Sequence, residues 1–431
     1  MEGLIRFLEK YFMPVAGRIA EQRHLRALRD GIVATIPLIL IGSAFLVIAF
    51  PPVAFLAAMV KPYVGNLLMV VNATFGIMAL VAAFSIAFSL AGSYKLDTLS
   101  AGVLSVSAFI LAMPFTKDGN IASAWMGSKG LFVAMLIGVF VVEVQRYMTK
   151  RNLVIKMPEG VPSSVARSFA ALFPGFIILT LVWVVNVILL STVGLPIPEV
   201  INTIITNPLL HLGGTLGAIL IAELVVQLLW SVGIHGAALV GGIMSPIWLA
   251  FTQQNAIAKA AGQVIPNIIS QQFVDVFVLI GGSGTTLALA VLLFTRVKSK
   301  QLKALGKTAI WPGLFNINEP ITFGMPIVMN PVMIIPWVLA PLTVAVITYV
   351  TMAAGLVGKP YALLPWTTPV FFSGFLATGD WKAVLLQLVN FIVAGAIYYP
   401  FLRVWDKAKL AEEKGMEEAE KATVGGTAFK A

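Results

Sequence analysis

Residues 316–331 read Asn-Ile-Asn-Glu-Pro-Ile-Thr-Phe-Gly-Met-Pro-Ile-Val-Met-Asn-Pro and place an ionisable residue, Glu319, inside an otherwise apolar part of the chain. The three prolines each remove a backbone donor and clash with the preceding turn, so this stretch is not an ordinary membrane helix. A carboxylate at bilayer depth costs about 2.5 kcal/mol or more unless it is paired or faces a cavity. The stretch therefore predicts a broken helix whose polar groups face a ligand site inside a membrane protein.

The composition is that of a polytopic membrane protein. Of the 431 residues, 59% are hydrophobic and only 11% are charged, and the mean hydropathy is +0.93. These values lie outside the range of soluble globular proteins. The chain has no cysteine, which excludes a disulfide framework, a thiolate nucleophile and a cysteine metal site. No histidine pair or acidic cluster has metal-binding spacing, so we expect neither a metal nor another cofactor.

The net charge of +10 does not indicate a nucleic-acid partner, because the basic residues lie in loops between apolar runs. Alternate loops hold 23 of the 29 lysines and arginines, and the positive-inside rule then predicts that both termini are cytoplasmic. This orientation requires an odd number of crossings between residues 230 and 273. The sequence offers one short candidate there, so the threading of residues 233–272 stays open.

Apolar runs long enough to cross a bilayer are arranged differently in the two halves of the chain. The first half has five such runs, at residues 31–50, 67–90, 99–115, 131–147 and 169–193. The second half has less regular runs, at residues 212–230, 234–251, 273–295, 361–375 and 382–402, and a proline-kinked run that ends near Leu356. We predict an all-α polytopic membrane protein with about ten transmembrane helices, re-entrant hairpins and amphipathic surface helices.

A proline-rich stretch without basic residues, near residues 194–207, marks the boundary between the halves. We predict an N-terminal transmembrane domain over residues 1–195, with an amphipathic linker at about 150–167. A C-terminal transmembrane domain that binds the ligand follows over residues 196–406. Residues 407–431 are polar and are expected to form a frayed cytoplasmic helix that ends in disorder. Apolar residues at helical spacing predict a further surface helix at residues 4–13.

Two residues are candidates for chemistry on a hydroxyl group. Glu319 lies between Asn318 and Pro320, where regular hydrogen bonding stops and a carboxylate can face a cavity; alternatively, it is a structural acid that caps a hairpin helix. His235 lies in the sequence Trp-Ser-Val-Gly-Ile-His-Gly at residues 230–236, where the glycines permit a turn. An imidazole accepts a proton near neutral pH and donates a hydrogen bond to a hydroxyl. The alternative for His235 is a satisfied core residue.

Two tryptophans, Trp230 and Trp366, flank these segments. An aromatic face complements the C–H face of a pyranose, whereas interfacial anchoring is the usual role of tryptophan in such chains. Both interpretations stay open for each residue.

The sequence Gly-Gly-Ser-Gly-Thr-Thr at residues 281–286 can present bare backbone groups, at Gly282 and Gly284, to ligand hydroxyls. It lacks the lysine and the strand of a phosphate-binding loop, and close helix packing is its alternative role.

Three further polar residues in apolar surroundings have less defined roles. Glu223 and Gln227 are one helical turn apart and either line a cavity or bond to each other. Asp275 lies near a helix start, where capping is favoured over catalysis.

Three stretches resemble one family of membrane proteins. They are Trp-Ser-Val-Gly-Ile-His-Gly at residues 230–236, Leu-Ile-Gly-Gly-Ser-Gly-Thr-Thr-Leu at 279–287, and Phe-Asn-Ile-Asn-Glu-Pro-Ile-Thr-Phe-Gly-Met-Pro-Ile-Val-Met-Asn-Pro at 315–331. They are similar to the membrane component, enzyme IIC, of the phosphoenolpyruvate-dependent sugar phosphotransferase system, in its lactose/cellobiose/chitobiose branch. The resemblance extends from the charged N-terminus to Leu402.

The resemblance implies a multi-pass homodimer in the bacterial cytoplasmic membrane, with its contact made by the five N-terminal helices. It implies one disaccharide of cellobiose, diacetylchitobiose or lactose type in each C-terminal half. A phosphocysteine on a separate cytosolic IIB protein would phosphorylate the sugar 6-hydroxyl, so this chain would be the membrane subunit of a sugar phosphotransferase. The catalytic residues of the family map onto Glu319 and His235, and its sugar-stacking aromatics map onto Trp230 and Trp366. Asn318 is a further expected sugar contact.

Two other functions fit the same residues. In a proton-coupled disaccharide symporter, Glu319 and His235 would be a proton relay. A membrane receptor would bind the sugar without transporting it.

Overall fold

A computed structural model describes residues 18, 22–51, 54–115, 119–158, 160–325, 327, 330 and 332–427. Within these ranges every regular element is a helix, and the only β-type pairing is an isolated bridge between Phe115 and Ile121. The prediction of an all-α protein is confirmed. The surface helix expected at residues 4–13 and the tail end at residues 428–431 lie outside the described residues.

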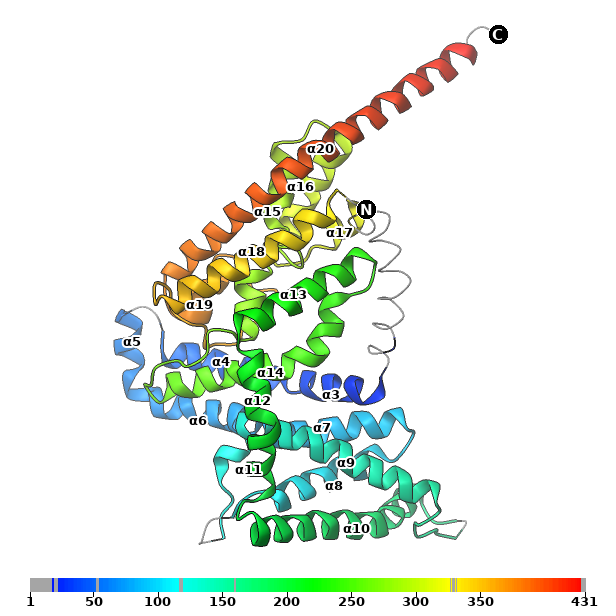
Figure 1. Ribbon diagram of the computed structural model, residues 1–431, viewed down its shortest axis with the longest axis vertical. Helices are drawn as coiled ribbons and strands as arrows, with labels where there is room; N and C mark the ends of the chain where they lie inside the picture. The colour runs from blue at the N-terminus through cyan, green and yellow to red at the C-terminus, as the bar shows by residue number, and fades with distance from the viewer. Residues whose placement is uncertain are drawn as a thin grey trace.

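The helices of the first half form a bundle in the lower part of Figure 1, with α3 and α4 at its upper edge. These helices contain the five apolar runs expected from the sequence. They are α3 (Arg23–Val33), α4 (Ile36–Ala49), α5 (Ala54–Val60), α6 (Val64–Thr74), α7 (Met78–Ser93), α8 (Thr98–Ala112), α9 (Leu131–Lys150) and α10 (Ser163–Thr192).

Small residues allow the central helix α7 to contact its neighbours closely. Ala79, Ala82 and Ala83 are fully buried. A Cβ atom on Gly31 of α3 would lie 2.6 Å from the Cα of Ile86, so the two helices touch through their backbones. Such close approach drives helix association in lipid, which is as apolar as leucine and gives no hydrophobic drive between helices.

The second half begins with a bent connection between the two bundles. The chain runs through α11 (Ile197–Ile201), the π-helix η6 (Asn202–Thr206) and α12 (Asn207–Gly213), and α13 (Leu216–Ser231) follows at 75°. The prediction of one span over residues 212–230 is wrong at its start. The helix ends at Gly213, and the Thr215 hydroxyl starts α13 by accepting a hydrogen bond from the Ala218 amide at 3.2 Å.

Most of the rest of the second half forms the upper part of Figure 1, while α14 (Gly236–Ala260) lies beside α3 and α4. The other elements are the π-helix η7 (Phe273–Val278), α15 (Leu287–Thr295), α16 (Lys300–Leu314), α17 (Glu319–Gly324), α18 (Ile334–Ala353), α19 (Phe372–Thr378) and α20 (Lys382–Thr427). Length and composition identify seven described helical spans, or eight if the bent pair counts as one span. The count of about ten transmembrane helices stays a prediction.

Residues 273–295 do not form the single span that hydropathy predicts. Gly281, Gly282 and Gly284 have φ angles of 81°, 93° and 79°, and Thr285 has 58°. Right-handed helix requires negative φ, so the chain forms a loop between η7 and α15 at this point.

Residues 233–272 combine a long helix with an extended return. The helix α14 continues nine residues beyond the predicted end at 251. The chain then runs back along it, because Asn255 Nδ2 donates to Asn267 O at 2.8 Å and the Thr252 hydroxyl accepts from the Gln271 amide at 3.1 Å. The return brings η7 back toward the start of α14.

The last helix, α20, passes the predicted end at residue 402 and reaches Thr427. Two of its carboxylates hold the loop before α16. Asp406 accepts the amides of Lys298 and Ser299 at 2.9–3.0 Å, and Glu413 accepts the Ser299 hydroxyl at 2.6 Å. These charge-assisted bonds explain why the polar end of the chain stays helical up to this level.

Candidate functional site

Six of the seven predicted site residues line one cavity of about 280 Å³ in the second half of the chain. They come from the end of α13, the start of α14, the 281–286 loop, the start of α17 and the loop before α19. The six residues are Trp230, His235, Gly282, Asn318, Glu319 and Trp366. The fold therefore gathers residues that are up to 136 positions apart in the sequence.

Glu319 is the first residue of α17, and Asn318 is the N-cap. This position suits the sequence, because a proline in the first helical turn loses no intrahelical hydrogen bond. The Glu319 side chain is exposed on the cavity wall. No described residue donates a hydrogen bond to its carboxylate, which leaves the carboxylate available to a ligand hydroxyl and gives no support to the capping alternative.

His235 is the N-cap of α14. Its Nδ1 atom accepts a hydrogen bond from the Ala238 amide at 3.1 Å. An imidazole nitrogen that accepts is not protonated, so the neutral ring carries its proton on Nε2. The ring lies against Trp230, with centroids 4.4 Å apart and planes at 45°. His235 is exposed rather than a core residue, and it offers the cavity an N–H donor.

The two tryptophans that line the cavity differ in exposure and in their hydrogen bonds. Trp230 is only 8% exposed, and its Nε1–H has no hydrogen-bond partner in the described structure. Trp366 is 56% exposed. Its carbonyl accepts a hydrogen bond from Asn316 Nδ2 at 2.6 Å, which fixes the loop that carries it. An unsatisfied buried donor beside a cavity is the arrangement expected for a ligand contact.

Two asparagines fix the glycine loop beside the cavity. Asn318 Nδ2 donates to the Ser283 carbonyl at 2.6 Å and to the Thr286 hydroxyl at 3.2 Å. Asn316 Oδ1 accepts from the Gly281 amide at 2.9 Å. Asn318 thus acts on the cavity by holding its wall, and Asn316 is a supporting residue that the sequence analysis did not single out.

The two glycines selected from the sequence have different surroundings. Gly282 lines the cavity, and a Cβ atom there would lie 2.6 Å from Asn318 Cγ. Gly284 does not line this cavity. A Cβ atom on Gly284 would lie 2.4 Å from the Trp337 ring, so this glycine permits the loop to pack against α18.

Asp275 is a cavity residue for which the sequence favoured a capping role. It lies in the first turn of η7, and Gln271 Nε2 donates to both carboxylate oxygens at 3.0 and 3.1 Å. The residue lines the cavity beside Trp366. By contrast, Gln227 Nε2 donates a hydrogen bond to the Glu223 carboxylate at 3.1 Å, and neither residue lines this cavity. Of the two roles that the sequence allows, the structure therefore has these residues bonded to each other.

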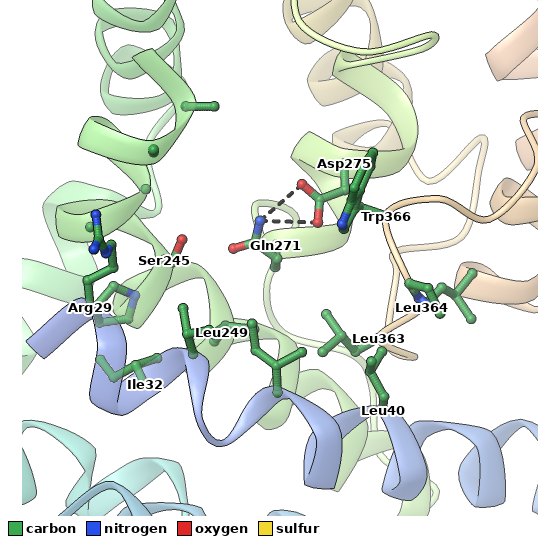
Figure 2. Close-up of a pocket in the computed structure, with 18 residues that line it drawn as sticks. Arg29, Ile32, Leu40, Ser245, Leu249, Gln271, Asp275, Leu363, Leu364 and Trp366 are labelled. Carbon is green, nitrogen blue, oxygen red and sulfur yellow. Dashed lines mark hydrogen bonds between the residues drawn. The ribbon is translucent and has the colours of Figure 1, made fainter. Parts of the chain in front are cut away.

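A larger cavity of about 580 Å³ continues from the first one toward α3 and α4. The two cavities share Ala237, Asp275 and Trp366. Figure 2 shows Arg29 of α3 on the opposite side of this hollow from Gln271 and Asp275. The walls between them are mostly aliphatic. The combined space is polar at the Glu319 end, and it opens between the two halves of the chain.

The cavity that contains Glu319 suits a neutral ligand rich in hydroxyl groups. Two carboxylates, one imidazole and two indole rings line it, and no lysine or arginine does among the residues that the structure describes. Among the described residues, no group of three or more histidine, aspartate or glutamate side chains could hold a metal ion. Aromatic faces combined with directed donors and acceptors are suited to sugar recognition.

Comparison with known proteins agrees with this chemistry. The family model described as "Phosphotransferase system, EIIC" matches residues 29–341. The chain is 50% identical to the "PTS system cellobiose-specific EIIC component" of Geobacillus stearothermophilus, over 96% of this chain and 97% of that protein. It is 48% identical to the "Lichenan permease IIC component" of Bacillus subtilis (strain 168), over 97% of each chain.

A solved structure is similar over nearly the whole chain. It is the crystal structure of the transporter ChbC, the IIC component from the N,N'-diacetylchitobiose-specific phosphotransferase system. The TM-score is 0.91 and the identity 50%, over 95% of this chain and 100% of that one.

Proposed function

The chain belongs to the EIIC family of the phosphotransferase system, and we propose that it carries a β-linked disaccharide across the cytoplasmic membrane while a separate IIB protein phosphorylates the sugar 6-hydroxyl. EIIC components are multi-pass membrane proteins that work with a sugar and a IIB partner. The observation that carries the residue-level proposal is the gathering of Glu319, His235, Trp230 and Trp366 on one cavity.

Glu319 is the proposed proton acceptor of the reaction. Its carboxylate is exposed to the cavity and has no hydrogen-bond donor among the described residues. In the transfer, the S–P bond of the IIB phosphocysteine breaks and leaves its electrons on sulfur, while the sugar 6-oxygen forms the new O–P bond. The hydroxyl proton must leave that oxygen, and a carboxylate within hydrogen-bond reach can accept it.

His235 is the proposed donor that orients the same hydroxyl group. Its Nδ1 lone pair is occupied by the Ala238 amide, so only the Nε2–H group can face a ligand while this bond is kept. An N–H donor to the 6-oxygen leaves the hydroxyl proton directed at another acceptor. The cap of α14 therefore favours Glu319 over His235 as the base.

The sugar itself is proposed to lie between the tryptophans. Trp230 Nε1–H would donate to a hydroxyl, and Asp275 would accept from one. A first ring in the 280 Å³ cavity would leave the second ring in the larger one beyond Trp366. Cellobiose is the first sugar to test, since it is named for a relative that is 50% identical.

The dimer and its orientation are parts of the same proposal. The helix α10 is apolar and largely unburied within one chain, with only 22% of its most apolar window covered. Phe176 is 67% exposed and Trp183 55% exposed. We propose that the first half, including α10, contacts a second copy, and that both termini face the cytoplasm. Disulfide cross-linking between single cysteines introduced on α10 tests the contact in a chain that has no cysteine of its own.

Membrane vesicles that contain this protein test the function. With phosphoenolpyruvate and a phosphorylated IIB protein, we expect labelled cellobiose to accumulate as the sugar phosphate. Glu319→Gln should lower the phosphorylation rate at least about 100-fold, as for loss of a general base, and should change cellobiose affinity only a few-fold. Glu223→Gln, a carboxylate outside the cavity, is the matched control.

Two results would contradict the proposal. Phosphorylation at the normal rate by Glu319→Gln would remove this residue from the mechanism. Unmodified cellobiose inside the vesicles, with uptake abolished by a protonophore, would indicate the proton-coupled symporter, which no relative reported above supports.

A further inference from the structure

A third cavity, of about 220 Å³, adjoins His235 on the side of the first half. One wall is α3, with Leu25, Arg26 and Arg29, and the other is the start of α14. His235 also lines the 280 Å³ cavity around Glu319, which we call the sugar cavity. Arg29 also lines the 580 Å³ cavity. The imidazole therefore separates a wall that carries arginines from the sugar cavity.

Among the described residues of this wall, Arg26 and Arg29 are the only ones with a permanent charge. They lie one helical turn apart and face the same cavity. Arg29 binds Asp30 through Nε at 2.9 Å and through one terminal nitrogen at 2.7 Å, so its other terminal nitrogen stays available. Arg26 forms no ion pair with any residue that the structure describes. Together they provide donors whose planar geometry suits phosphate oxygens.

The start of α14 adds positive potential to the same cavity. This helix has 25 residues and begins at Gly236, directly after His235. The amide of Ala238 is occupied by His235 Nδ1, whereas those of Gly236 and Ala237 have no intrahelical acceptor. The helix dipole favours an anion at this end.

The sugar cavity has the opposite charge. Asp275 and Glu319 line it, and none of its described lining residues is a lysine or an arginine. A phosphoryl group carries about −1.5 to −2 charges at neutral pH, so these carboxylates would repel it. Arg26 and Arg29 of α3, which line the adjoining cavity together with His235, could offset this charge.

We propose that Arg26 and Arg29 bind the phosphoryl group beside His235, first on the incoming donor and then on the sugar phosphate. This inference rests on the proposed function, which requires such a group to reach the sugar 6-oxygen. It assigns to the first half of the chain a direct part in a reaction whose other residues belong to the second half. The ligand class is a phosphate monoester dianion.

Binding to the purified full-length protein in detergent tests the site, with cellobiose, cellobiose 6-phosphate and inorganic phosphate as probes in isothermal titration calorimetry. We expect Arg29→Gln and Arg26→Gln each to weaken binding of cellobiose 6-phosphate about tenfold. Arg26 lines neither of the two cavities assigned to the sugar, so Arg26→Gln should also leave cellobiose affinity within twofold. Arg23→Gln is the matched control, because Arg23 lies on the same helix but lines none of the three cavities.

Unchanged affinity for the sugar phosphate in both variants would overturn the proposal. So would an equal loss in Arg23→Gln, since it would indicate a long-range effect of net charge. If the wild-type protein fails to bind cellobiose, the proposed function fails. Titration with inorganic phosphate then tests the phosphoryl site by itself. Phosphate binding that is lost in the Arg26 and Arg29 variants supports the site, and no phosphate binding refutes it.

Discussion

Replacing Gly282 with alanine tests whether the glycine loop shapes the sugar cavity. Gly282 has φ of 93°, a conformation that residues with a Cβ atom rarely adopt. The new Cβ atom would lie 2.6 Å from Asn318 Cγ and 2.8 Å from the Asn316 carbonyl oxygen. Either the loop or both asparagines must move, and all three belong to the cavity wall.

The expected loss follows from two contributions. An alanine at strongly positive φ costs about 1–2 kcal/mol. Displacing Asn318 weakens its hydrogen bonds to the Ser283 carbonyl and the Thr286 hydroxyl, worth about 1 kcal/mol or more in total. The sum is about 3 kcal/mol, which corresponds to about a 100-fold loss of affinity if the bound state must restore the original loop.

Equilibrium binding of labelled cellobiose to the purified protein measures this loss. Gly217→Ala is the control, because a Cβ atom on Gly217 of α13 meets no heavy atom within 4 Å. We expect the control to bind normally and to be slightly more stable, since alanine favours a helix over glycine. Elution of the Gly282→Ala protein as a single species in size-exclusion chromatography checks that the variant is folded. Wild-type affinity of the folded variant for cellobiose would refute the argument that this loop shapes the cavity wall.

Three further outcomes follow from the site and its supports. Trp230→Phe should weaken cellobiose binding about fivefold, because the ring face stays and the unpaired Nε1–H is lost; equal affinity by calorimetry would show that this donor does not contact the sugar. Asp275→Asn should weaken it about tenfold by removing a charged acceptor that Gln271 orients, and unchanged binding in the same assay would return Asp275 to a structural role. Asp406→Ala should destabilise the protein by about 2 kcal/mol, because the amides of Lys298 and Ser299 lose their carboxylate acceptor. Glu412→Ala removes only an exposed ion pair and should leave the stability unchanged. Equal melting temperatures of the two variants in thermal unfolding would contradict this expectation.

The residues that line this cavity are marked in the sequence by local signals, and their roles stay a prediction. Pro320 after Glu319 and the glycines around His235 show where a helix must stop, and in a membrane such breaks occur only where the backbone lines a cavity or is buried in protein. Both residues do start helices at the cavity wall. That they face the same cavity depends on the packing of α13, α14 and α17, which no local pattern contains.

Long-range hydrogen bonds explain what hydropathy missed in the second half. Residues 273–295 are apolar enough to be read as one span, but the loop between η7 and α15 is held by Asn316 and Asn318, some 35 positions further along. The sequence favours a helix-capping role for Asp275 because the contacts that bring this residue to the cavity are also long-range. Its role at the cavity depends on the extended return after α14, which Asn255 and Asn267 hold in place.

The distribution of charge between the two halves gives the proposed reaction a direction. In the second half, a neutral sugar would meet aromatic rings, polar groups, two carboxylates and the aliphatic residues Ala237 and Leu279. Once phosphorylated, the sugar carries about two negative charges. At an effective dielectric constant of about 20, the repulsion between one such charge and a carboxylate about 6 Å away is about 3 kcal/mol. The arginines of α3 act in the opposite sense on the far side of His235. The sugar phosphate would therefore bind more weakly in the sugar cavity than the free sugar does, and it would favour a position nearer α3. The phosphorylation step itself would then oppose rebinding of the product at the original site.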